Sequence, residues 1–192
     1  ETQSLVVDNG VGGRMSALTP FPAIEGDLAH LLVRRGGMLT FPSETHFATG
    51  SVAETLIEEG SALLQGGDGF ARFTGDVVNV TTDSVLGCVS CAWSQTLDNG
   101  VRGCRGVCVP WNITARSLSV SHGARVAGVS IGIAASPPNG SVVIEPGGGV
   151  VPSDTAGDSD VFVSAGVVHI GGFVRASSID MRAEGAVDIP EG

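Results

Sequence analysis

The strongest constraint on the fold of this chain is a short motif that recurs along its 192 residues. The motif is an apolar residue, any residue, an apolar residue, two turn residues, a glycine, two further residues and an apolar residue. Residues 31–39, 118–126 and 142–150 match it throughout, residues 55–63 begin with threonine, and residues 78–86 have aspartate in place of glycine. Weaker copies place their glycines at positions 10, 100, 166 and 185.

The turn positions of these copies are 10, 36, 60, 83, 100, 123, 147, 166 and 185, so their mean spacing is near 22 residues. Alternate residues of a strand face the same side, so each pair of apolar residues points inward. Glycine supplies a positive φ at the corner, and aspartate can replace it. One coil cannot bury its apolar stripe alone, whereas stacked coils bury a continuous core. The sequence therefore predicts a single all-β domain, residues 1–192, folded as a parallel β-helix (β-solenoid) of about nine coils.

Composition agrees with strands. Valine and isoleucine are abundant, and 29 glycines follow no collagen-like period. Two windows, 24–33 and 51–60, have weak helical periodicity and are open to a short helix, a capping element or a strand pair. The alternative fold is a β-sandwich or another antiparallel barrel, which also has short strands but does not require one turn pattern every 22 residues or so.

Residues 115–126, 141–150 and 161–189 resemble the right-handed parallel β-helix of secreted adhesins and autotransporter passengers. The sequence of residues 115–126 is typical of such coils: Ala-Arg-Ser-Leu-Ser-Val-Ser-His-Gly-Ala-Arg-Val. The resemblance covers about two thirds of the chain and implies an extracellular structural or binding role. It also extends to pectin lyases and other enzymes that cleave polysaccharides, so the fold alone does not decide the function.

Four cysteines, Cys88, Cys91, Cys104 and Cys108, gather in a stretch that interrupts the repeats, residues 87–112. Their C-x2-C and C-x3-C spacing is compatible with Zn²⁺, but two disulfides that pin a loop are favoured, with three pairings open. Trp93 and Trp111 flank this insert, where they would seal the loop or stack on sugar. Three N-glycosylation sequons begin at Asn79, Asn112 and Asn139, and Asn79 is expected to face outward between Val78 and Val80.

The formal net charge is −10, with ten arginines and no lysine, which disfavours nucleic acid and anionic lipid as partners. The sequence has no run of about 20 apolar residues, so it predicts no membrane span. The best acidic cluster, Asp154, Asp158 and Asp160, suits Ca²⁺ or glycoside hydrolysis, but a solvated turn is the favoured interpretation. The four histidines, His30, His46, His122 and His169, are interpreted as structural or surface residues.

We therefore expect a non-enzymatic extracellular protein without metal or cofactor, a rod segment of a surface appendage, fibre or adhesin. Its expected partners are other protein subunits, by end-to-end or lateral assembly, and surface glycans. The alternatives are a carbohydrate-active enzyme and a glycan-binding module.

Overall fold

The computed structural model describes residues 3–10, 18–20, 27–41, 52–65, 72–87, 111–128, 130–136, 139–152 and 159–189. Within these ranges the chain forms strands and turns but no helix. The two windows with weak helical periodicity contain strands instead, Leu28–Arg34 and Val52–Ile57.

The strands form a seven-stranded sheet and a twelve-stranded sheet whose two arms share one long strand, β7. One arm, called sheet A, contains β1 (Gln3–Asp8), β3 (Leu28–Arg34), β5 (Val52–Ile57), β7 (Arg72–Val80), β10 (Ser117–Val120), β13 (Ser141–Ile144), β16 (Val167–Ile170) and β19 (Val187–Asp188). The other arm, sheet C, contains β7, β9 (Trp111–Ala115), β12 (Ser130–Ala135), β15 (Asp160–Ala165) and β18 (Ser178–Ala183). The seven-stranded sheet, sheet B, contains β2 (Leu18–Pro20), β4 (Met38–Phe41), β6 (Ala62–Gln65), β8 (Val85–Gly87), β11 (Arg125–Gly128), β14 (Gly149–Pro152) and β17 (Phe173–Val174).

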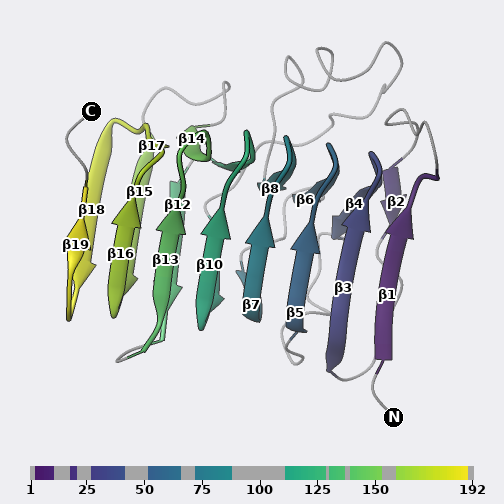
Figure 1. Cartoon of the computed structure of the whole chain (residues 1–192), viewed down its shortest axis with the longest axis horizontal. Coiled ribbons are helices and arrows are strands. Elements are labelled where there is room, and N and C mark those ends of the chain that lie inside the picture. The colour runs from purple at the N-terminus through teal and green to yellow at the C-terminus, as the bar shows by residue number, and fades with distance from the viewer. Residues whose placement is uncertain are drawn as a thin grey trace.

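Every strand pairing among the described residues is parallel. The predicted all-β fold with parallel strands is therefore confirmed, and the antiparallel alternative does not describe these strands. The strands of sheet A lie side by side from β1 to β19 along the long axis of the molecule, with the two termini at opposite ends (Figure 1). Eight described strands make up sheet A.

The register keeps equivalent positions of the motif in line. Val33 pairs with Ile57, Ile57 with Val80, Val80 with Val120 and Val120 with Ile144. These side chains are buried in one apolar core to which all three sheets contribute. Because Val80 is the direct neighbour of Val120, the stretch that contains the cysteine insert leaves the pairing of sheet A uninterrupted.

The corner between each sheet A strand and the following sheet B strand, called the A–B corner, has the conformation that the motif predicts. Gly36, Gly60, Gly123 and Gly147 have φ values of 73°, 70°, 84° and 84°, and Asp83 has φ 58°. Aspartate thus replaces glycine at this corner with the left-handed backbone expected of it. Four of these positions follow a residue that also has positive φ, namely Arg35, Glu59, Thr82 or His122. The motif does not predict this second left-handed residue.

The weaker copies at Gly166 and Gly185 belong to a different corner. Gly166 lies between β15 of sheet C and β16 of sheet A, and Gly185 lies between β18 and β19 in the same way. The motif wrongly assigns these two positions to the A–B corner, because a strand of sheet C has the same inward alternation as a strand of sheet A. The copy at Gly100 lies outside the described residues.

Candidate functional site

The four cysteines, Cys88, Cys91, Cys104 and Cys108, lie outside the described residues, as do Trp93, His46, Asp154 and Asp158. The choice between disulfides and zinc therefore stays a prediction. Elsewhere, the described His, Asp and Glu side chains do not gather in groups that could hold a metal ion.

The three sequon asparagines occupy three separate places on the surface. Asn79 lies in β7 between the fully buried Val78 and Val80 and is partly exposed, so its predicted outward direction is confirmed. Asn112 is exposed in β9 of sheet C, where its amide oxygen lies over Gly132 of β12 and fills the space that a side chain there would need. Asn139 is exposed in the turn that precedes β13.

Asp160 is exposed at the start of β15, where it pairs in register with Ser130 of β12 and Ser178 of β18. Both of these neighbours are hydroxyl residues. Since Asp158 lies outside the described residues, the predicted carboxylate pair is not placed by the structure.

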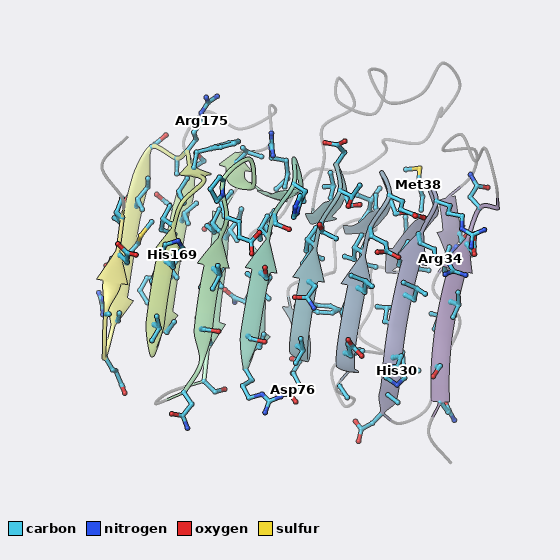
Figure 2. The ribbon with its side chains drawn as sticks, in the orientation of Figure 1. His30, Arg34, Met38, Asp76, His169 and Arg175 are labelled. Atoms are coloured by element: carbon cyan, nitrogen blue, oxygen red, sulfur yellow. The ribbon has the colours of Figure 1, made fainter. Side chains whose placement is uncertain are left out.

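Two histidines each contact a carboxylate on the neighbouring strand of sheet A. His30 Nδ1 lies 3.1 Å from Glu54 Oε2, and His169 Nδ1 lies 2.8 Å from Asp188 Oδ2. All four side chains are substantially exposed (Figure 2). These contacts tie adjacent strands together on the outer face, which fits the surface role expected for these histidines.

His122 lies in a hydroxyl cluster at the A–B corner. Its Nδ1 atom is 2.9 Å from Ser121 Oγ and 3.3 Å from Thr81 Oγ1, and Ser121 Oγ donates to Thr81 Oγ1 over 3.1 Å. A hydroxyl beside an imidazole is the minimal pair for nucleophilic chemistry. Here, however, Ser121 is 7 % exposed and its hydroxyl donates a hydrogen bond to Thr81 of the neighbouring corner. The cluster therefore links two neighbouring corners.

At the A–B corners nearest the N-terminal end, charged side chains of neighbouring corners form a ladder. Asp8 Oδ2 accepts from Arg34 Nε over 2.8 Å and lies 3.4 Å from Arg35 Nη2, which belongs to the same corner. The backbone N–H of Gly10 donates to Asp8 Oδ1 over 2.8 Å. This hydrogen bond, followed by the two guanidinium groups, lowers the pKa of Asp8 from its ordinary value of 3.8.

Sequence reasoning missed a cluster on the outer face of sheet B that consists of Arg125, Phe173 and Arg175. The guanidinium carbons of Arg125 and Arg175 lie 4.7 and 5.1 Å from the centre of the Phe173 ring. The ring lies over Gly149, where a side chain would collide with it, and Arg175 projects from the edge of the molecule (Figure 2). The motif describes inward positions only, so it carries no signal for residues that meet across outward positions of different strands.

These two arginines differ from the others whose side chains are described. Arg34, Arg35, Arg116 and Arg182 each have a carboxylate within 4.0 Å. Arg125 instead directs Nη1 to the carbonyl oxygens of Gly123, Ala124 and Gly147, and neither it nor Arg175 has a described carboxylate partner. In a chain of net charge −10, two such cations on one aromatic ring are a distinctive feature.

The second feature that the sequence did not predict is the exposed C-terminal end of the core. Ile179 of β18 is 45 % exposed, whereas Val161, its neighbour in β15, is 2 % exposed. Val187 of β19 is 48 % exposed, whereas Val168, its neighbour in β16, is fully buried. The inward columns therefore continue to this end, called the open end below, and reach solvent there.

The chain matches no protein-family model, and searches of curated proteins and of solved structures find nothing similar to it. As for membranes, none of the described segments is a helix with the length and apolar character of a membrane span.

Proposed function

We propose that this chain is a parallel β-helix that serves as a non-enzymatic, extracellular rod segment of a surface appendage, fibre or adhesin. The parallel pairings, the glycine-rich A–B corners and the main apolar core shared by the three sheets support the β-helix. The exposure of Ile179 and Val187 supports the structural role, because apolar side chains in solvent favour contact with another protein surface. On this proposal the partners are other protein subunits.

The experiment that tests assembly compares the wild-type chain with Ile179→Asp by sedimentation velocity over a range of concentrations. Wild-type protein is expected to associate as concentration rises, while the variant is expected to stay monomeric because a carboxylate blocks the apolar contact. Ser119→Asp, an outward and partly exposed substitution on β10 in the middle of sheet A, is the matched control. A wild-type chain that is monomeric at all concentrations contradicts the proposal.

The extracellular location is proposed on the cysteines and the sequons, and the exposed positions of Asn112 and Asn139 support it. The test is the intact mass of protein from a eukaryotic secretory host, measured before and after reduction and deglycosylation. Reduction of two disulfides is expected to raise the mass of the protein by four mass units. Deglycosylation is expected to remove one glycan from each occupied sequon. A chain that retains Zn²⁺ with four free thiols contradicts the disulfide prediction.

A second candidate function is glycan binding, favoured by the Arg125–Phe173–Arg175 cluster. Guanidinium groups bind carboxylates through paired hydrogen bonds, and an aromatic ring offers an apolar face beside them. We propose that the ligand of this cluster is a sugar chain that carries carboxylates. The test is calorimetric titration with polygalacturonate oligomers, with neutral dextran oligomers as the uncharged control.

Binding of the acidic oligomer that is lost in Arg175→Ala and Phe173→Ala supports this function. Arg116→Ala, which removes an exposed arginine paired with Asp76, is the matched control and should bind normally. Binding that persists in both Arg175→Ala and Phe173→Ala contradicts the proposal. Cleavage of the oligomer during the titration would instead favour the enzyme alternative.

A further inference from the structure

Asparagine is followed directly by glycine three times in the chain, at residues 9–10, 99–100 and 139–140. The first and third pairs lie in the part of the chain that the structure describes. Asparagine is a thermolabile residue, and a glycine after it favours attack of the backbone nitrogen on the side-chain amide, because glycine has no Cβ to hinder the approach. The two described pairs therefore allow a comparison within one molecule.

The pair Asn139 and Gly140 lies at the end of the turn between β12 and β13. Asn139 is exposed to solvent, and among the described residues no hydrogen-bond partner is found for its side-chain amide or for the Gly140 N–H. The chain is fixed on the other side of this pair. The carbonyl oxygen of Gly140 accepts from Val167 N–H over 3.0 Å, and Ser141 N–H donates to the carbonyl oxygen of Arg116 over 2.9 Å.

Packing requires the glycine of this pair but not the asparagine. A Cβ atom at Gly140 would collide with the backbone of Ala135 and Ser136. Asn139 projects into solvent, where packing does not demand an amide. The fold therefore keeps an unhindered glycine nitrogen next to whichever side chain occupies position 139.

The pair Asn9 and Gly10 differs in one contact. The Gly10 N–H donates to Asp8 Oδ1 over 2.8 Å, and the same carboxylate accepts from Arg34 Nε over 2.8 Å. To attack the asparagine, the glycine nitrogen must lose its proton. A carboxylate that binds this N–H opposes the loss, because it forfeits a hydrogen bond and repels the negative charge that forms. Gly10 is therefore a poorer nucleophile than Gly140.

We propose that Asn139 is a site of spontaneous deamidation and that Asp8 protects Asn9 from the same reaction. The Gly140 nitrogen gives its proton to hydroxide and forms a bond to Cγ of Asn139. The bond between Cγ and Nδ2 breaks, and Nδ2 takes a proton from water and leaves as ammonia. Water then opens the succinimide at either carbonyl, which leaves aspartate or isoaspartate at position 139. This inference is independent of the proposed rod function.

The modification competes with the sequon that begins at the same residue. A glycan is attached to Nδ2 of asparagine, which is the atom that must leave as ammonia, so an occupied sequon is expected to block deamidation of Asn139. The isoaspartate product adds a methylene group to the backbone where Gly140 already packs against Ser136. We therefore expect isoaspartate to weaken the start of β13 more than the variant Asn139→Asp does.

The test uses protein from a host that does not glycosylate, incubated in mildly alkaline buffer made with heavy-oxygen water and analysed by peptide mass spectrometry. Heavy oxygen is expected to enter position 139 at least about tenfold faster than position 9, and faster as the pH rises. Asp8→Ala frees the Gly10 N–H, so it should raise the rate at Asn9 severalfold and leave Asn139 unchanged. Glu54→Ala, which removes an exposed carboxylate that contacts His30, is the matched control and should change neither rate.

The outcomes separate the two parts of the proposal. Faster labelling at position 139, with the rate at Asn9 raised by Asp8→Ala, supports both. Equal wild-type rates at the two positions, or labelling at neither, overturn it. Faster labelling at position 139 with no effect of Asp8→Ala overturns the protective role of Asp8.

A secretory host tests the competition with the glycan. Ser141→Ala removes the sequon but keeps Asn139 next to Gly140, so deamidation should appear in this variant and be absent from glycosylated wild-type peptides. Glycopeptides are measured without enzymatic release, since an amidase would itself turn the asparagine into aspartate. Deamidation of glycosylated Asn139 at the rate of the variant contradicts the block. A wild type that carries no glycan at Asn139 contradicts the sequon prediction, and the proposed deamidation then occurs in the wild type as well.

Discussion

Sheet B has one inner face and two different outer faces. In its first half, the outward residues Met38, Ala62, Leu64 and Val85 are all buried and form an apolar cluster separate from the main core, which Ala127 and Val151 extend into the second half. In its second half, the equivalent positions hold Arg125, Gly149 and Phe173, followed along the chain by Arg175. Facing inward, Leu39, Leu63, Leu86, Val126 and Val150 form one unbroken column along both halves.

This contrast shows that the inward and outward positions of one strand respond to separate demands. The inward column lies in the close-packed core along both halves, and it holds leucine and valine throughout. Outward positions are free to change from coil to coil. A strand that is buried on both faces has a continuous apolar sequence, as Ala62-Leu63-Leu64 does. The later strands β11 and β14 begin with Arg125 and Gly149 at the outward position and continue with two apolar residues.

The corner next to sheet B varies from strand to strand as well, and the largest predicted effect lies there. One position of the A–B corner is glycine at Gly37 and Gly148, alanine at Ala124, and serine at Ser61 and Ser84, both fully buried. A side chain at Gly148 would collide with the backbone carbonyl of Val120. Gly148→Ser should therefore destabilise the protein by roughly 3 kcal/mol, because the backbone of two neighbouring coils must move apart.

Urea-induced unfolding measures this loss. The matched control is Ser61→Ala at the same corner position, which should leave stability nearly unchanged or slightly raised because the buried Ser61 Oγ has no hydrogen-bond partner. Equal losses in the two variants would show that the corner at Gly148 tolerates a side chain as well as the corner at Ser61 does, which contradicts this prediction.

The second prediction concerns the inward column of sheet A. In the first half it contains Thr55, which is fully buried and whose Oγ1 has no hydrogen-bond partner, whereas the equivalent positions in the second half are Leu118 and Val142. Thr55→Val replaces the hydroxyl with a methyl group of the same shape and makes the two halves alike. We expect a gain of about 1–2 kcal/mol in the free energy of unfolding.

Thermal and urea unfolding both report this gain. Thr114→Val, on the outward side of β9 where the side chain is only partly buried, serves as the control and should change stability little. A loss of stability in Thr55→Val would mean that the threonine hydroxyl makes a contact that its surroundings do not reveal.

The parts of the fold that were predicted from sequence are those in which one copy of the motif alone carries the signal. The alternation of Val78, Asn79 and Val80 and the left-handed corner at Asp83 depend on neighbours in the chain, so the motif predicts both. The position of Gly166 was misassigned because sheets A and C share one alternation. The open end and the Arg125–Phe173–Arg175 cluster depend on how coils stack, so no local pattern indicated them.

The smallest predicted effect concerns the charged ladder of Asp8, Arg34 and Arg35, which the second half lacks, since its equivalent corners hold Pro146 and Gly171. The pKa of Asp8 is lower in the folded chain than in the unfolded chain, so the carboxylate favours folding above pH 3.8. That contribution disappears as the pH falls through the lowered pKa. Asp8→Asn should therefore be less stable than the wild type near neutral pH and equally stable in strong acid, with a small difference because the group is exposed to solvent. Urea unfolding of both proteins from neutral to acid pH measures this, and a stability difference that stays constant over the whole range would show that Asp8 contributes through packing or the corner conformation instead of its charge.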